Sequence, residues 1–493
     1  MTLVHRVLYP TPIGSLEEYL KARGGAGLST ARDLGADEII SVIEASGLRG
    51  RGGAGFPTGR KWRTVRAYCS EFERTSVVVN AAEGEPGTFK DRTILRNDPY
   101  QVLEGALIAA RALDADEVIV ATKQAFAVEI DHLRRAIDEI KGAGWSDGIE
   151  IEVFQGPNEY LYGEETALLE TIDGRYPFPR IAPPYRRGVR EVVESAEDLG
   201  TQSGLSAHVE MAGPGDDTEA PPALVDNVET LANVARILAR GAEWFRTVGT
   251  PESPGTIVCT VTGSTRRSGV GEVIMGTPLR EVIDLIGGGP RPGRRIRAVL
   301  PGVSNRFIDG SALDTPVSYE ALAAVGSGLG SAGFLVFDDA DDLVAVAAGV
   351  ARFLAVESCG QFSPCKLDGL RIAELLDATA RGEAAQHDIE ELRSSIAKVA
   401  EGARCSLATQ QQLMATSLLE LFPDDIDAHL DGQAPSTAPR LVAELVGIDD
   451  DGIARVDERH GEKQPDWTYD PVDSGKTPAA RLGEHREPRT LDE

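Results

Sequence analysis

The chain lacks the features that would place it in a membrane or on nucleic acid. Its longest apolar run, residues 343–356, is too short to span a bilayer and contains Arg352. Basic residues are also in deficit, because 50 lysines and arginines face 78 aspartates and glutamates and leave a net charge of -28. Nucleic acids and anionic membrane surfaces are bound through basic surfaces, so the charge balance argues against both as partners.

Cysteine is scarce as well, with five in 493 residues. They are too few and too unevenly spaced for a disulfide framework, and the clustering of three late in the chain points toward metal. Residues 1–20 contain two prolines and no long apolar core, so they do not resemble a signal peptide. With 42% hydrophobic residues the composition is that of a globular chain. We therefore expect a cytoplasmic protein without direct membrane insertion.

Strand and helix patterns alternate in the first half of the chain. Apolar β-branched runs predict strands at 76–80, 117–121 and 149–154, and apolar residues at helical spacing predict helices at 37–45, 100–113 and 126–141. This alternation predicts an α/β fold, here a Rossmann-like domain with a largely parallel sheet over residues 36–250. An irregular arm, 1–35, precedes it, and a Gly-, Ser- and Pro-rich insertion interrupts it at 188–224.

The second half of the chain changes character twice. A strand pattern at 256–261 followed by a helix pattern at 279–286 predicts a small ubiquitin-like β-grasp domain over 255–335. Helical spacing then predicts a helical bundle over 336–432. The last residues, 433–493, are polar and contain several prolines, so a polar tail is expected there.

A glycine-rich segment at 47–62 is the first functional signal. Glycines let a backbone approach a ligand and expose its N–H groups, while Arg and Lys supply charge for a phosphate. The segment is not a P-loop, because Gly59-Arg60-Lys61 lacks the required Gly-Lys-Ser/Thr. It also does not follow a predicted strand, as the dinucleotide fingerprint requires. Taken alone, it indicates either a phosphate-binding loop or a flexible surface loop.

Four segments together carry a family resemblance. GRGGAGFPTG at 50–59 is followed in order by NAAEGEPGTFKDR at 80–92, YLYGEETAL at 160–168 and DNVETL at 226–231. These segments resemble those of the F-type flavoprotein subunit of respiratory complex I, a family also found in NAD-reducing hydrogenases and formate dehydrogenases. The resemblance extends over about residues 40 to 430.

The resemblance implies FMN as cofactor and NAD(H) as substrate. It assigns contacts with FMN to the following residues: Gly50, Arg51, Gly52, Gly53, Ala54, Gly55, Lys61, Asn80, Glu83, Tyr160, Gly163, Glu164, Asn227 and Thr230. It assigns contacts with NADH to Phe56, Lys61, Glu85, Glu165 and Tyr185. Hydride passes between nicotinamide and flavin, so the protein supplies position and electrostatics and no catalytic side chain is expected. The implied partner is a thioredoxin-like [2Fe–2S] subunit or another electron-transfer subunit, which is compatible with a place at the periphery of a membrane complex.

The iron–sulfur motif of the family is altered in this chain. The family reads Glu-Ser-Cys-Gly-x-Cys-x-Pro-Cys with a fourth cysteine further on, whereas this chain offers only Cys359, Cys365 and Cys405, with Phe362 at the remaining position. Phenylalanine cannot ligate iron, and thiolates are the soft ligands that such clusters require. Three interpretations stay open: loss of the cluster, a three-cysteine [3Fe–4S] or [4Fe–4S] cluster, or another metal such as zinc.

Smaller departures touch the flavin and nucleotide segments. Ala82 stands where the family has an aspartate, Asp226 where it has an asparagine, Tyr162 where it has a small residue, and Ala182 where many members have a lysine. Two functions are therefore considered. The first is an NADH dehydrogenase flavoprotein subunit that passes electrons to a partner or works in reverse. The second is a repurposed paralogue that serves as a flavin-binding or scaffold subunit without NADH oxidation.

Overall fold

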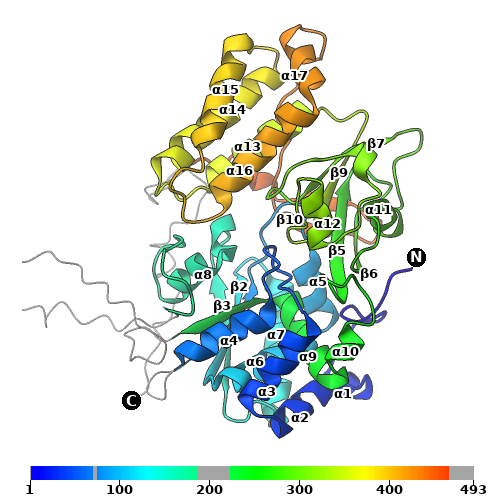
Figure 1. Ribbon diagram of the computed structural model, residues 1–493, viewed down its shortest axis with the longest axis vertical. Coiled ribbons are helices and arrows are strands. Elements are labelled where there is room, and N and C mark those ends of the chain that lie inside the picture. Colours follow the sequence, from blue (N-terminus) through cyan, green and yellow to red (C-terminus); the bar gives the residue numbers. More distant parts are fainter. Residues whose placement is uncertain (1, 70–74, 187, 189–221, 466–493) are drawn as a thin grey trace, which may run out of the picture.

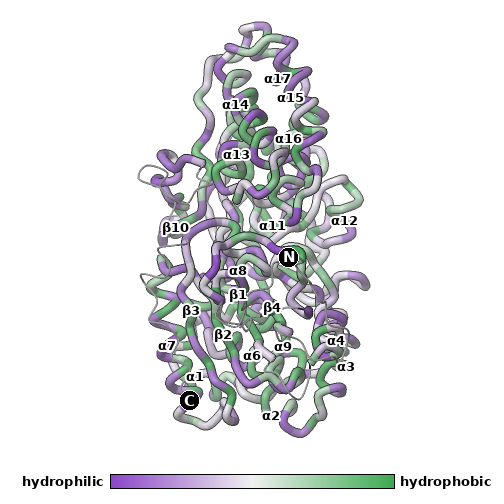
Figure 2. The backbone as a smooth tube through the Cα atoms, turned by 90° about the vertical axis from the view of Figure 1, so that its left-hand side faces the viewer, coloured by the Kyte–Doolittle hydropathy of each residue, from purple (hydrophilic) through white to green (hydrophobic). Residues whose placement is uncertain are grey.

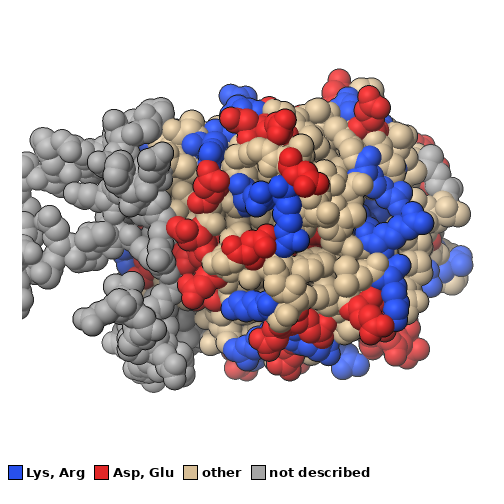
Figure 3. Space-filling view, turned by 90° about the horizontal axis from the view of Figure 1, so that it is seen from below, with Lys and Arg blue, Asp and Glu red and all other residues tan. Residues whose placement is uncertain are grey.

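The computed structural model describes residues 2–69, 75–186, 188 and 222–465. An α/β region lies at the bottom of Figure 1, a second sheet lies above it at the right, and helices α13 to α17 form the top. Within the described residues, no helix is long and apolar enough to cross a lipid bilayer. On the face seen from below, acidic and basic side chains are interspersed (Figure 3), so the acidic excess does not gather there in one patch.

The α/β region is built on a four-stranded parallel sheet in the order β3-β2-β1-β4. Its strands are β1 (Ser76–Ala81), β2 (Glu117–Lys123), β3 (Glu150–Gly156) and β4 (Ala223–Asn227). Every residue of β2 is buried, which explains the apolar run 118–121 at its centre. The parallel Rossmann-like sheet is as predicted, but β4 begins inside the predicted insertion 188–224. Residues 189–221 lie outside the described residues.

Helices cover this sheet. They are α3 (Ala36–Ser46), α4 (Thr58–Tyr68), α5 (Lys90–Asn97), α6 (Pro99–Leu113), α7 (Ala127–Gly142), α8 (Glu165–Ile172), α9 (Val228–Arg240) and α10 (Ala242–Phe245), with the 3₁₀ turn η1 (Tyr160–Gly163). Gly105 lets α6 press against α9, because a Cβ there would lie 1.9 Å from the Leu231 carbonyl oxygen. Figure 2 shows hydrophobic residues along α6 and along the strands of the sheet.

The N-terminal arm, 1–35, was predicted to be irregular, and this prediction is wrong for residues 16–33. It forms α1 (Leu16–Lys21) and α2 (Ala26–Asp33). Tyr19, Leu28 and Ala31 are buried in the core of the α/β region. Both helices are eight residues or shorter, so neither shows enough helical periodicity in the sequence to be recognised.

The second sheet has five strands in the order β6-β5-β9-β7-β8. They are β5 (Thr256–Gly263), β6 (Gly269–Ile274), β7 (Ile296–Pro301), β8 (Ile308–Asp309) and β9 (Gly333–Asp338). The central pair β5 and β9 is parallel and the other pairs are antiparallel. Helix α11 (Leu279–Gly287) buries Val282, Ile283 and Ile286 in the core of this sheet, and η2 (Gly310–Ala312) and α12 (Tyr319–Ala324) complete the region.

Five helices follow, with a short π-helical segment, η3 (Pro364–Asp368), between the first two. They are α13 (Leu343–Glu357), α14 (Gly369–Ala380), α15 (Gln386–Lys398), α16 (Leu407–Leu421) and α17 (Pro423–Leu430). All five contribute buried residues to one hydrophobic cluster. Residues of α13 are buried on all sides, which is why this helix carries the longest apolar run in the chain.

The segment predicted as a polar tail starts with ordered structure that packs on the body of the protein. It contains the hairpin of β10 (Leu445–Ile448) and β11 (Ala454–Val456), followed by η4 (Glu458–Gly461). Glu444 pairs with the buried Lys123 at 2.5 Å, and Lys463 pairs with the buried Glu357 at 2.5 Å. The tail prediction is therefore wrong for residues 433–465, and its remainder, 466–493, lies outside the described residues.

Candidate flavin and nucleotide site

The matched segments meet at the carboxyl edge of the parallel sheet. Strand β1 lies between β2 and β4. The chain places β2 and β3 on one side of β1 and then returns to place β4 on the other side, so the strand order reverses at β1. Such a switch point is where open α/β sheets bind ligands. Segment 80–92 runs from the end of β1 into α5, and segment 226–231 runs from the end of β4 into α9. These two motifs therefore lie side by side at the edge where a ligand is expected.

The third motif, 160–168, contacts the end of β1 directly. The side-chain amide of Asn80 donates to the Gly163 carbonyl oxygen at 2.8 Å. A Cβ on Gly163 would lie 3.0 Å from the Ala82 carbonyl oxygen, so only glycine lets η1 come this close without a shift. Asn80, Ala82 and Gly163 thus hold η1 against the switch point.

The glycine loop connects α3 to α4 and has a fixed base. Gly50 donates its amide to the Phe56 carbonyl at 2.8 Å, and Thr58 donates to the Leu48 carbonyl at 2.9 Å. Gly53 and Gly55 have φ angles of 130° and 62°, which favour glycine. At the tip, the amides of residues 52–54 donate no hydrogen bond of normal geometry to any described residue. The loop therefore presents free N–H groups on a backbone without bulky side chains.

The tip of the loop lies beside the N-terminus of α9. A Cβ on Gly52 would be 3.2 Å from the Asn227 Cβ. Asn227 caps α9 by accepting a hydrogen bond from the Glu229 amide at 2.9 Å. Free loop amides and the positive end of a 13-residue helix are both groups that favour an anion, so this place is a candidate anion site. This arrangement fits the phosphate of a flavin mononucleotide.

Arg51 faces away from this anion site. Its guanidinium is buried and donates to the Pro254 and Thr256 carbonyls at 3.1 and 3.0 Å. Its backbone amide donates to the Thr230 hydroxyl at 2.9 Å. Arg51 therefore ties the loop to α9 and to the start of β5, and its side chain is already engaged by protein atoms.

A buried group of charges lies behind the helix N-terminus. Lys90 is 2.7 Å from Asp91 and 3.0 Å from Glu229, and it donates to the Asn227 side chain at 3.3 Å. Burial works against the charged form of Lys90, but the two carboxylates outweigh it and raise its pKa. Asn227 in turn donates to Asp91 at 2.8 Å. Lys90 thus offsets two acidic groups that would otherwise repel an anion bound at α9.

The acidic residues assigned to the site make contacts within the protein. Glu83 pairs with Arg92 at 3.0 Å and accepts the Asp91 amide at 3.1 Å. Glu85 accepts the Val303 amide at 3.2 Å, and burial raises its pKa. Glu164 caps α8, and burial raises its pKa too. Glu85 and Glu164 are therefore easier to protonate than exposed glutamates.

Apart from Glu85, the side chains assigned to the nucleotide lie around α4. Lys61 pairs with Glu165 at 2.8 Å and donates to the Val225 carbonyl at 2.6 Å. Burial opposes the charge of Lys61, yet Glu165 and Asp226 raise its pKa. Phe56 is 47% exposed, so its ring is open to stacking. The Tyr185 ring instead packs against Tyr68, with centroids 5.2 Å apart.

Asp226 gives a pH-dependent prediction. It accepts a hydrogen bond from the Trp62 indole at 2.7 Å, and burial raises its pKa from 3.8 to about 6. A raised carboxyl pKa contributes stability that is present below pH 4 and lost as the pH rises through 6. We therefore expect Asp226→Asn, which keeps the acceptor for Trp62, to stabilise the fold by about 1–3 kcal/mol at pH 7.5 and by far less at pH 4.5.

Urea unfolding of both proteins at the two pH values measures this difference. Asp314→Asn is the matched control, because Asp314 is 79% exposed and its substitution should leave the pH dependence unchanged. Equal stabilisation by Asp226→Asn at both pH values would contradict the prediction.

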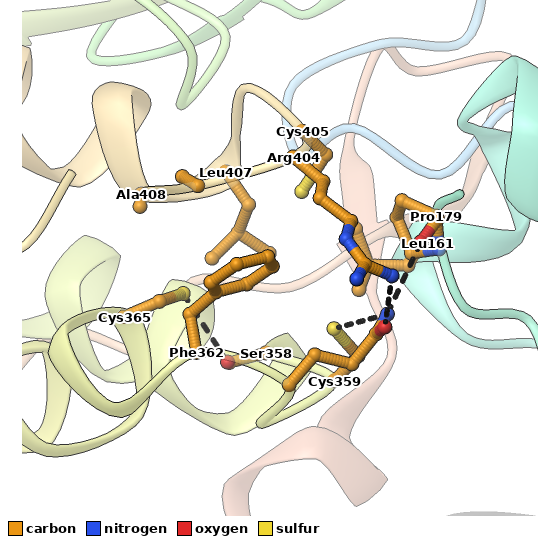
Figure 4. Close-up of a pocket in the computed structure, with 12 residues that line it drawn as sticks. Leu161, Pro179, Ser358, Cys359, Phe362, Cys365, Arg404, Cys405, Leu407 and Ala408 are labelled. Atoms are coloured by element: carbon orange, nitrogen blue, oxygen red, sulfur yellow. Dashed lines mark hydrogen bonds between the residues drawn. The ribbon is translucent and has the colours of Figure 1, made fainter. Parts of the chain in front are cut away.

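The three late cysteines line a second pocket, between η1 and the C-terminal helices. Cys359 follows α13, Cys365 lies in η3 and Cys405 precedes α16. Phe362 lines the same pocket, and its ring projects into the space that the three thiols border (Figure 4). The residues present do not fit a cluster held by four cysteines.

Two family models match the chain. One, described as the Nuo51 FMN-binding domain, covers residues 43–236. The other, described as the NADH-ubiquinone oxidoreductase-F iron-sulfur binding region, covers residues 345–429. The first spans the glycine loop, the parallel sheet and the start of α9, and the second spans the three cysteines. The chain therefore carries the FMN-binding and iron–sulfur binding regions of one family.

Whole proteins agree with these matches. The chain is 34% identical over 434 residues to the F 2 subunit of the NADH-quinone oxidoreductase of Rhizobium meliloti (strain 1021), covering 85% of this chain and 96% of that protein. It is 33% identical to the HndC subunit of the NADP-reducing hydrogenase of Solidesulfovibrio fructosivorans, covering 85% and 81%. A crystal structure of an NAD+-reducing [NiFe]-hydrogenase in the H2-reduced state superposes with a TM-score of 0.71 at 30% identity, covering 85% and 67%.

The parallel sheet, the anion site at its switch point and the matched regions define a flavoprotein subunit of an oxidoreductase. More narrowly, the chain belongs to the family of NADH-quinone oxidoreductase F subunits.

Several residues that shape the site were not among the predicted ones. Lys90 and Asp91 lie at the end of the second motif, so the signal that could have identified them was their charge within a matched segment. Tyr319 donates to the Gly50 carbonyl at 2.7 Å, and its ring lies 4.3 Å from the Arg49 guanidinium. No local pattern marks Tyr319, because its partners lie about 270 positions earlier in the chain.

Proposed function

We propose that the protein is the FMN-containing subunit of an NADH dehydrogenase module, which transfers hydride between NADH and FMN and exchanges electrons with a partner subunit. The observation that carries this proposal is the anion site, where the free amides of residues 52–54 meet the N-terminus of α9 at the switch point of the sheet. The reaction, hydride transfer between NADH and FMN, is proposed because the chain belongs to the family of NADH-quinone oxidoreductase F subunits.

In the proposed function, this chain's residues bind and orient the reactants. The loop amides and α9 hold the FMN phosphate, with Thr230 fixing the loop through the Arg51 amide. When bound, FMN supplies the hydride chemistry. Asn80 positions η1, so that Gly163 and Tyr160 border the flavin side of the site. The exposed ring of Phe56 offers a stacking surface for a nucleotide base.

The nucleotide contacts proposed for Lys61, Glu165 and Tyr185 rest on their placement around α4. The Lys61–Glu165 pair is partly exposed, with 26% and 41% of the two side chains accessible, so a substrate can reach it. Lys61 is the only one of these three that carries a positive charge. It therefore offers a direct counter-charge to a pyrophosphate, in a chain that has Ala182 where many relatives have lysine.

The proposal includes a division into domains. Residues 36–250 form the FMN and NADH domain, 255–335 a β-grasp domain and 336–432 a helical bundle. The β-grasp assignment is supported by the central parallel pair β5 and β9 and by α11, which packs on the sheet after the β5–β6 hairpin. A thioredoxin-like [2Fe–2S] subunit is the proposed electron-transfer partner.

An anaerobic titration of the purified protein with NADH, followed by its visible spectrum, tests the function. We expect a bound flavin whose absorbance near 450 nm bleaches on addition of NADH. The same titration with NADPH compares the two nucleotides. A flavin that is bound but stays oxidised with both nucleotides would contradict the proposed reaction and favour the repurposed paralogue, whereas a chain without flavin would contradict the site itself.

A further inference from the structure

The three-cysteine pocket is filled by the protein's own side chains. It is lined by Leu161, Pro179, Ser358, Cys359, Gln361, Phe362, Cys365, Ala403, Arg404, Cys405, Leu407 and Ala408, and its free volume is about 10 Å³. A cavity of this size holds about one water molecule. In Figure 4 the Phe362 ring lies with Cys365 on one side and Cys359 and Cys405 on the other.

Phe362 is held in this position by its neighbours. The Arg404 guanidinium lies over the ring, 5.3 Å from its centroid, and donates to the Gln361 side-chain oxygen at 3.0 Å. Gln361 in turn donates to the Pro179 carbonyl at 3.2 Å and to the Cys359 sulfur at 3.4 Å. The ring therefore belongs to a connected set of contacts that joins the cysteine loop, residues 358–365, to the segment before α16.

The cysteines also have partners within the protein. The Cys365 sulfur is 3.3 Å from the Ser358 hydroxyl, and Cys359 accepts the hydrogen bond from Gln361. Among the described residues, no three His, Cys, Asp or Glu side chains are grouped so that they could hold a metal ion. The polar side chains that remain near Phe362 are Ser358, Gln361 and Arg404, and none of them offers a soft sulfur ligand.

From this disagreement between the family's iron–sulfur region and the residues in it, we propose that this chain does not hold a four-iron cluster, and that Phe362 is the reason because it removes the fourth thiolate. Four-iron clusters are held by four thiolates, and the pocket offers three. The inference concerns iron content alone, so its test does not depend on the proposed NADH chemistry.

The test compares the full-length wild-type chain with Phe362→Cys after anaerobic reconstitution with ferrous iron and sulfide. Buffers contain no added small thiol, because such a thiol can supply a fourth ligand. We expect at most three irons per wild-type chain, and about four irons and four acid-labile sulfides per chain for Phe362→Cys. Reduced Phe362→Cys should also give the electron paramagnetic resonance signal of a [4Fe–4S]⁺ cluster, which the wild-type chain should lack.

Phe362→Leu separates the missing thiolate from the bulk of the ring. Leucine is apolar and not a ligand, so this variant should bind iron as the wild type does. Four irons in the wild-type chain would overturn the proposal. It would equally be overturned by four irons in Phe362→Leu, or by failure of Phe362→Cys to bind four irons while its FMN content and melting temperature match those of the wild type.

Discussion

Gly55→Ala is expected to reduce bound FMN to less than about a tenth of the wild-type amount, a loss of at least about 1.4 kcal/mol of binding free energy. Gly55 has a φ angle of 62°, and a Cβ there would lie 2.4 Å from the Tyr319 ring. Tyr319 cannot simply swing away, because its hydroxyl holds the Gly50 carbonyl and its ring stacks on Arg49. The glycine loop must therefore move, and its free amides lose their place beside α9.

The flavin content of the purified variant, measured from its absorbance and from released FMN, tests this expectation. Gly144→Ala is the matched control, because Gly144 has a similar φ angle of 72° but nothing lies within 4 Å of its would-be Cβ. The control carries only the cost of a left-handed alanine, about 1–2 kcal/mol of stability, and should keep its FMN. Full FMN occupancy in Gly55→Ala would show that the loop does not bind the cofactor.

What the sequence could predict was mostly local. β1 and β2 each contain an apolar run, 77–79 and 118–121, and both strands were predicted within two residues of their observed ends. The matched motifs led to Asn80, Gly163 and Asn227, which the structure brings to one edge of the sheet. The roles of these residues in binding FMN and NADH are proposals that rest on this arrangement.

Contacts between distant segments could not be predicted. Arg51 was selected as a flavin residue, yet its guanidinium is engaged by carbonyls about 200 positions later in the chain. β4 is five residues long and ends in Asp226 and Asn227, so it lacks the apolar pattern of a buried strand. In both cases the decisive partner belongs to another part of the fold, which composition and periodicity do not encode.

The segment after residue 432 shows the same limit. It is polar because it neutralises buried charges of other segments. Glu444, with 18% of its side chain exposed, pairs with Lys123 at 2.5 Å and lies 3.7 Å from Arg92, both of which are almost fully buried. A second contact joins Lys463 to Glu357, the last residue of α13, just before the cysteine loop. Polar composition therefore predicted a solvated tail where the structure has a docked one.

Glu444→Gln is accordingly expected to destabilise the protein by about 2–4 kcal/mol, because it leaves the buried Lys123 without its carboxylate and leaves Arg92 with Glu83 alone. A surface ion pair contributes only about 0–1 kcal/mol, so Glu420→Gln, at a pair in which Glu420 is 55% exposed, is the matched control. Thermal unfolding should show a melting temperature several degrees lower for Glu444→Gln and nearly unchanged for Glu420→Gln.

The double variant Lys123→Met/Glu444→Leu removes both charges and should recover much of the loss, because an apolar pair leaves no uncompensated charge in the interior. Equal melting temperatures for the wild type and Glu444→Gln would mean that the C-terminal segment does not dock on Lys123.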